Sequence, residues 1–435
     1  MFSRRAVRSL LALAPALAMP ALAFSVSRCS ASSKAGFVAT DAGIDAPSFA
    51  MTCGHDDCDG DGYSMANGDC NDQDPQVNPE AFDFIDGADN DCDGTVDNPV
   101  LTCETIPSQA PGSPTDFVRA ADMCQQHSKT LDGTIFDPLI KADWGSVSGY
   151  GPAQRIWTSA TKPEIQTNIV TSFGMNAPRQ GKTMFGLSNG PWATPTPRES
   201  MPLDPTGFEL TDACADIPLM GQDCASLSAG TSAGGLNVQD WAELKIWVRV
   251  PSNAQTLSFD FAFFTTEFNQ FWNAALNDAF FVLVSSAEMQ GTNVAKDAKG
   301  LAITVNSGFF QLCPKAPGPA GLSPDKSAAL ASCVGTDGDA TQQVFGTLKG
   351  TGFDGAGSAP FDGTATSADR TKKYVYGGGS GWLTASFPVT PREQLTMRVL
   401  IHDTFDGLKD SAVLVDSLRW SPTVPTTSGV QRPPR

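Results

Sequence analysis

The sequence predicts a mainly β protein, in which a small, helix-poor module precedes a large β-sandwich domain of the jelly-roll type. Three observations lead to this fold class. Several segments alternate apolar and polar residues with a period of two, which is typical of half-buried strands. Glycine and proline punctuate the whole chain, with 41 and 31 residues. Helical periodicity is scarce, and residues 115–126 are the only fair helix candidate.

The clearest strand candidates lie in the second half of the chain. Residues 243–250 alternate and stop at Pro251, and residues 256–263 alternate in the same way. Residues 279–284 and 412–415 are short apolar runs that suit strands buried on both faces. Alternating and fully apolar strands with few helices between them favour a sandwich of two sheets.

Residues 1–23 are expected to be a signal peptide. A basic start with three arginines is followed by the apolar residues 10–22, and Ala21-Leu22-Ala23 supplies small residues for cleavage. A membrane anchor is disfavoured, because the apolar run contains two prolines and is short for a span. No other segment is long and apolar enough to cross a membrane, so we expect a protein that is secreted or displayed on the outer cell surface.

The chain has 11 cysteines, which in an exported protein indicate disulfides. Cys29 lies apart from the others and is the candidate for the odd one. It is either a lipid attachment site or a free or processed cysteine, although Arg28 stands where a lipid-attachment motif has a small residue. Cys214 with Cys224 and Cys313 with Cys333 are plausible local pairs, but the sequence leaves the connectivity open.

Composition divides the chain further. Residues 24–52 are rich in Ser, Ala, Gly and Asp and are expected to be a flexible linker. An acidic, cysteine-bearing module follows at residues 53–103, and the large β domain takes residues 104–421. Residues 422–435 are polar and proline-rich, and are expected to be a disordered tail.

The acidic charge is concentrated in one stretch. Residues 35–118 contain no Lys or Arg but 18 of the 47 acidic residues, and the other 29 balance the 29 basic residues of the chain. This distribution argues against a nucleic-acid partner, which requires clustered Lys and Arg. Carboxylates packed so closely repel one another unless a cation neutralises them.

Two loops within this stretch have the spacing of calcium ligands, with side-chain oxygens at alternate positions and glycine at the sixth. In the first loop the ligands are Asp57, Asp59 and Asp61, with Gly62 at the sixth position and the Tyr63 carbonyl at the seventh. In the second loop the corresponding residues are Asp89, Asp91, Asp93, Gly94, the Thr95 carbonyl and, at the ninth position, Asp97.

Neither loop has the bidentate Glu that an EF-hand carries at position 12, where Gly68 and Val100 stand. Asp69, Asp72 and Asp74, between the loops, are therefore candidates for the remaining ligands. We predict Ca²⁺ as the bound ion.

The module resembles the metal-binding repeat of secreted bacterial surface proteins, which is related in pattern to thrombospondin type 3 repeats. The matching segments are residues 58–63, 68–75, 78–81 and 86–94. Ile85 departs from the pattern, since many such repeats have cysteine there. The resemblance implies a non-catalytic, cation-binding spacer at the cell exterior.

The large domain is similar to the choice-of-anchor L domain of exported bacterial proteins. This similarity covers roughly residues 180–421, and the segments that carry it are residues 240–247 with 257–264, 265–271 with 277–281, and 381–384 with 410–420. It implies a β-rich extracellular domain. A second calcium site at one end of the sandwich is a further hypothesis, with turn capping as the alternative, and its candidate ligands are Glu267, Asn277, Asp278, Asp403, Asp406 and Asp416.

The sequence therefore predicts an exported, calcium-binding, non-catalytic protein of the cell surface or extracellular space, adhesive or structural. Its expected partners are divalent cations and envelope or matrix polysaccharide or protein. The alternative is a carbohydrate-binding or carbohydrate-active protein that uses Trp144, Trp157 and Trp192. A remoter alternative is a serine hydrolase, because Gly-Thr-Ser232-Ala-Gly fits the nucleophile pattern, although it lacks the strand and helix that flank a nucleophile elbow.

Overall fold

The structure is a computed structural model of the 435-residue chain. It describes most of the acidic module and most of the long strands of the large domain. The described residues are 56–97, 113–123, 127–129, 135–144, 146–147, 151–152, 156–158, 163–190, 192, 238–265, 278–287, 289–297, 300, 302–304, 307, 309, 351, 353, 378–404, 411–425 and 429–432.

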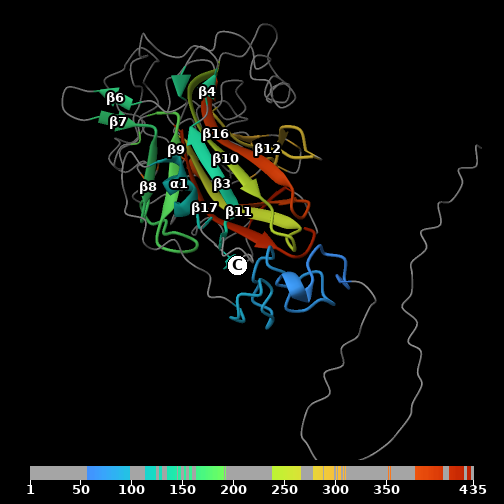
Figure 1. Cartoon of the computed structure of the whole chain (residues 1–435). Helices are drawn as coiled ribbons and strands as arrows, with labels where there is room; N and C mark the ends of the chain where they lie inside the picture. Colours follow the sequence, from blue (N-terminus) through green and yellow to red (C-terminus); the bar gives the residue numbers. More distant parts are fainter. Residues whose placement is uncertain are drawn as a thin grey trace, which may run out of the picture.

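Two antiparallel sheets form the large domain, and the predicted mainly β fold is confirmed (Figure 1). The first sheet has the order β13 (Thr292–Asn293), β12 (Ala279–Ser285), β16 (Gln394–Thr404), β10 (Val238–Arg249) and β3 (Leu139–Trp144), with β14 (Ile303–Thr304) also paired to β12. The second has the order β18 (Gly429–Gln431), β15 (Gly378–Pro388), β11 (Thr256–Thr265), β17 (Ser411–Ser421), β9 (Met184–Ser188) and β8 (Thr167–Val170).

The remaining described elements are short. Three two-stranded pairs are β1 (His127–Lys129) with β2 (Ile135–Phe136), β4 (Ser146–Val147) with β5 (Gly151–Pro152), and β6 (Ile156–Thr158) with β7 (Pro163–Ile165). A 3-10 turn, η1 (Met65–Asn67), lies in the module, and α1 (Pro114–Ala120) follows it. None of the described helices is both long and apolar enough to cross a membrane.

The main core lies between the two sheets. On β10 the side chains of Leu244, Ile246 and Val248 are buried, while Lys245 and Trp247 between them are partly exposed. This is the alternation that the sequence predicts, since successive side chains of a strand point to opposite faces. The consecutive long strands β10, β11 and β12 alternate between the sheets, so chain order and sheet membership are interleaved.

Strand β11 is buried on both faces. Phe259, Phe261 and Phe263 point into the main core, whereas Phe264 belongs to a second apolar cluster with Phe173 and Phe353. The phenylalanines of this strand are therefore core side chains. This second cluster therefore covers the outer face of the second sheet around Phe264.

Helix α1 is shorter than the predicted 115–126. It begins after Ser113, whose hydroxyl accepts the N–H of Asp116, and it ends at Ala120. Asp122 follows with a φ of 69° and so leaves the helical path. Phe117 anchors the helix on the sandwich, with its ring 5.0 Å from that of Trp144.

The C-terminal residues differ from the sequence-based expectation. Gly429–Gln431, expected within a disordered tail, form strand β18 and pair with β15. Arg432 then donates hydrogen bonds to the carbonyls of Ser380 and Phe309. Backbone pairing with a sheet edge needs little apolar side-chain content, which is why composition alone did not indicate this strand.

The acidic module, blue in Figure 1, lies at one end of the sandwich. There it contacts the connection between β10 and β11 through Ser252 and Asn253, and the turn between β15 and β16 through Arg392. Phe82 of the module is part of the main core cluster. The module is therefore packed against the large domain and shares its core.

Candidate metal centre

The module is built from a series of short turns in which an aspartate closes its own bend. One carboxylate oxygen of Asp59 accepts the N–H of Asp61, and one of Asp61 accepts the N–H of Tyr63. Asp69 bonds to the N–H of Asn71 in the same way. Aspartate favours such turns because its short side chain reaches the backbone two residues ahead. Each turn occupies one carboxylate oxygen and leaves the second for another partner.

The two predicted loops have the same internal hydrogen bonds. Asp57 accepts the N–H of Gly62 at 2.9 Å, and Asp89 accepts the N–H of Gly94 at 3.0 Å. Both glycines have positive φ, 95° at Gly62 and 92° at Gly94. The predicted sharp bend at the sixth position is confirmed in both loops, and glycine adopts it without the steric cost of a Cβ atom.

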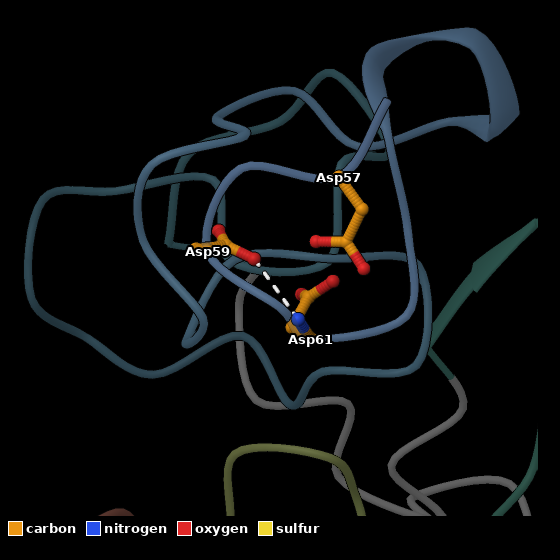
Figure 2. A group of neighbouring side chains, drawn as sticks. All are labelled: Asp57, Asp59 and Asp61. Carbon is orange, nitrogen blue, oxygen red and sulfur yellow. Dashed lines mark hydrogen bonds between the residues drawn. The ribbon is translucent and has the colours of Figure 1, made fainter. Parts of the chain in front are cut away.

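Three groups of carboxylates converge in the described part of the module. In each group the potential ligand atoms lie within 4.8 Å of one another. The groups are Asp57, Asp59 and Asp61; Asp59, Asp69 and Asp72; and Asp89, Asp91 and Asp93. Figure 2 shows the first group, in which the carboxylates of Asp57 and Asp61 face each other within the loop. Asp59 belongs to two groups and so links them.

Three of these side chains have buried oxygens without a hydrogen-bond partner in the described part of the chain: the Oδ2 atoms of Asp59, Asp61 and Asp69. Burial raises the pKa of all three, that of Asp69 to about 6, and the neighbouring carboxylates raise it further. A buried carboxylate oxygen is unfavourable unless a donor or a cation satisfies it. The first loop and Asp69 therefore present adjacent oxygens whose electrostatic requirements the protein does not meet itself.

The second loop is joined to this cluster covalently. Cys70, next to Asp69, forms a disulfide with Cys92, which lies between Asp91 and Asp93. Asp91 is fully buried, and burial raises the pKa of Asp89. The disulfide thus holds the middle aspartates close to the second loop. Cys58, inside the first loop, is also disulfide-bonded.

The other predicted ligands have different positions. Asp72 accepts the N–H of Cys58 at 2.9 Å and lies in the second group. Asp74 bonds to the N–H of Gln76, and Asp97 to the N–H groups of Asp86 and Gly87. Neither Asp74 nor Asp97 belongs to the three groups. Their roles as ligands stay predictions, as do those of the Tyr63 and Thr95 carbonyls.

Sequence reasoning missed the sharing of Asp59 and the pairing of Cys70 with Cys92. The first loop and Asp69 are brought together by the return of the chain after η1, which no local pattern encodes. A signal was nevertheless present, because Asp69 and Asp72 flank Cys70, and a disulfide there would hold both carboxylates near the loops.

The hypothesis of a second calcium site in the sandwich is not supported by its two described candidates. Asp278 accepts a hydrogen bond from the Ser411 hydroxyl at the start of β17. Asp416 lies five residues further along the same strand, about 17 Å away at the rise of a β-strand. These two carboxylates are therefore too far apart to share an ion. The side chains of Glu267, Asn277, Asp403 and Asp406 lie outside the described residues.

The remaining alternatives are tested only in part. Trp144 packs against Phe117 and Trp192 against Phe173, and both are partly buried against the apolar clusters, which leaves less of each ring free to stack on a sugar. The side chain of Trp157 lies outside the described residues, as do Ser232 and Cys29. So do Cys214, Cys224, Cys313 and Cys333, and residues 1–52.

Comparison with known proteins gives one match. A family model named Cu-binding_MopE, with the description "Putative metal-binding motif", matches residues 69–98. No curated protein and no solved structure matches the chain. The matched segment contains Asp69, Asp72 and the whole second loop. The chain therefore carries a metal-binding motif, and the carboxylate groups lie within it or directly before it.

The donor atoms allow a test of which metals fit. All three groups consist of carboxylates, and the described cysteines of the module are oxidised to disulfides and offer no thiolate. His402 is buried in the sandwich and stacks on Phe281. Hard cations such as Ca²⁺ take oxygen ligands, whereas copper favours imidazole and sulfur donors. The described oxygen ligands fit a hard cation better than they fit copper.

Proposed function

We propose that this chain is an exported, calcium-binding, non-catalytic protein of the cell surface or extracellular space, with an adhesive or structural role. The observation that supports it most is the set of buried, unsatisfied oxygens on Asp59, Asp61 and Asp69. They lie beside further carboxylates in loops that share the same bend. Such a set gains stability when a cation replaces the missing donors.

Calcium is the ion that we propose for these groups. Ca²⁺ accepts roughly six to eight oxygens in irregular geometry, and backbone carbonyls and water complete the shell readily. Mg²⁺ demands near-ideal octahedral geometry and parts with its water reluctantly, so loops of this kind suit it less. Extracellular calcium modules often bind at about 10⁻⁴–10⁻³ M, which agrees with export.

Export and the exterior role are supported by the sequence. The basic and then apolar start is typical of a signal peptide, and the large domain is similar to choice-of-anchor L domains. In this proposal the cations stiffen the module, and the sandwich presents a surface to envelope or matrix polysaccharide or protein. Ions that fix a fold serve a structural purpose and require no catalytic residues.

The test is calorimetric titration of the chelator-treated chain with Ca²⁺, Mg²⁺ and Cu²⁺ in turn. We expect Ca²⁺ uptake that Asp59→Asn and Asp91→Asn each weaken by more than about tenfold at one class of site, since each removes one buried charged ligand. Asp143→Asn, at an exposed position of β3, is the matched control and should leave the titration unchanged.

Two results would contradict the proposal. Stoichiometric binding of copper that millimolar calcium does not displace would refute calcium as the bound ion, although the module would still be a metal site. Absence of any cation uptake would refute the metal-binding function itself.

A further inference from the structure

One fully buried side-chain amide, that of Asn253, holds the module on the sandwich, and we call this contact the seat. Asn253, between β10 and β11, accepts the N–H of Phe82 at 2.8 Å and donates to the carbonyls of Phe82 and Gln76. Three hydrogen bonds from a single side chain fix the backbone of residues 76–82 in position and orientation. Ser252 adds a backbone hydrogen bond to the carbonyl of Glu80.

A charged cluster lies beside this amide. Glu80 of the module pairs with Arg249 at 2.7 Å and with Arg392 at 3.2 Å. Arg392 has a φ of 66°, and its guanidinium lies 5.6 Å from the centroid of the Tyr63 ring. The sandwich thereby places a cation directly against the last residues of the first loop. Because both arginines are partly exposed, each ion pair contributes little alone, and their main effect is on position.

Asn78 connects this seat to the first loop. Its side chain is fully buried, and its carbonyl oxygen accepts from the Ser252 hydroxyl and from the N–H of Glu80. The Asn78 side chain and the Arg392 guanidinium lie near Asp61, a member of the first carboxylate group, and act to lower its pKa against the effect of burial, but its Oδ2 atom has no hydrogen-bond partner among the described residues. The same few side chains therefore contact the sandwich on one side and lie near a carboxylate of the first group on the other.

We propose that seating of the module on the sandwich and ion binding in its two loops are one coupled equilibrium, with Asn78 and Arg392 as positioning residues. This inference rests on the proposed function. An ion that draws Asp61 into its shell fixes the loop against Asn78 and Arg392, and the seat in turn holds the loop in its binding form. The second loop is connected to the same seat. The backbone N–H of Asn78 donates to the carbonyl of Asn90 at 2.8 Å, and Asn90 is also bonded to Asp83 and Phe84.

Coupling between two events is reciprocal in binding free energy. If calcium tightens the seat, then a variant that loosens the seat weakens calcium binding by the same factor. The seat variant Asn253→Ala removes three hydrogen bonds that lie outside every carboxylate group. It should weaken calcium binding in both loops roughly five- to 150-fold, the usual range of such coupling.

The experiment is calorimetric Ca²⁺ titration of the full chain in two backgrounds. In Asp91→Asn the first loop still binds, and addition of Asn253→Ala should reduce its affinity at least about fivefold. In Asp59→Asn the second loop still binds, and Asn253→Ala should likewise reduce its affinity at least about fivefold. Asn176→Ala, which removes a buried amide elsewhere in the sandwich, is the matched control and should alter neither.

The outcomes separate this inference from the proposed function. If calcium still binds in both backgrounds and Asn253→Ala does not change its affinity, the coupling is overturned and the proposed function stands. An equal loss in Asn176→Ala would also overturn it, because that result indicates general destabilisation. If Asn253→Ala does not melt cooperatively, Glu80→Gln, which weakens two ion pairs, replaces it with the same expected loss of calcium affinity.

Discussion

Asp122 and Asp416 form a buried pair of acidic side chains where α1 meets the second sheet. Asp122 is 2% and Asp416 0% exposed. Asp416 accepts the backbone N–H groups of Arg179 and Ser417. Burial raises the pKa of Asp416 to about 8, with Asp122 adding repulsion, and burial raises that of Asp122 to about 6. The pair therefore holds a proton at pH values where an exposed aspartate would be ionised.

These shifts give the stability of the domain a definite pH dependence. Because the two pKa values are higher in the folded state than in the unfolded chain, folding favours the protonated forms. This preference stabilises the folded state most at low pH. The stability it provides is lost as pH rises from about 4 through 6 and 8. We expect Asp122→Asn, which removes one charge, to stabilise the protein at pH 8 by on the order of 2–3 kcal/mol and to have little effect at pH 4.

Denaturant unfolding of the sandwich at both pH values checks this expectation. Asparagine suits position 122 because it tolerates the positive φ found there. Asp143→Asn, at an exposed position, is the control and should shift stability by less than about 0.5 kcal/mol at either pH. A variant that is equally stabilised at both pH values would contradict the shared-proton explanation.

At the residue scale, the sequence predicts what neighbouring residues encode. The bends at Gly62 and Gly94 follow from aspartate and glycine spacing, and the structure confirms them. The contact of Asp59 with Asp69 and Asp72 could not be predicted, since it depends on the return of the chain through space. The seat of the module on Asn253 is equally non-local, because Phe82 and Asn253 have a sequence separation of 171.

At the scale of the element, prediction succeeded where side chains alternate in size and polarity. The predicted strands 243–250 and 256–263 correspond to β10 and β11. Strand β15 was not predicted from periodicity, because its first residues are Gly, Gly, Ser and Gly and carry little apolar signal. Strand β9 was missed as well. Gly186 of this strand has no side chain, so its position adds no apolar signal to the sequence.

Gly186 leaves room for the indole of Trp192. A Cβ atom at Gly186 would lie 2.2 Å from the Trp192 ring, which packs on Phe173 in the second apolar cluster. We predict that Gly186→Ala destabilises the sandwich by about 1–3 kcal/mol, the usual cost of overpacking. Thermal unfolding measures the loss.

A double-mutant cycle tests the cause of that loss. In the Trp192→Leu background the steric conflict is absent, so adding Gly186→Ala should cost less than about 0.5 kcal/mol. An unchanged penalty in that background would show that the backbone of β9, and not the indole, sets the cost.

At the scale of the whole molecule, two kinds of link hold the module together. It has few apolar core side chains of its own, among them Val77, Ala81 and Phe82. The Cys70–Cys92 disulfide joins residues with a sequence separation of 22. It stabilises the folded module by about 3 kcal/mol, because it lowers the conformational entropy of the unfolded chain. Under the proposed function, cations bound to the carboxylate groups are the second link. A small module with a minor core depends on such links.

The two links should compensate for each other. We expect that Cys70→Ser/Cys92→Ser in calcium, and the unmodified chain in EDTA, both keep residues 56–97 resistant to limited proteolysis for most of the digestion. The double variant in EDTA should lose that resistance, while strands β10–β12 and β15–β17, with their own core, stay intact. Mass spectrometry of the fragments locates the cleavages. If the unmodified chain in EDTA is cleaved at the same rate as the double variant in EDTA, cations alone hold the module together. If the double variant in EDTA stays resistant, packing against the sandwich is sufficient.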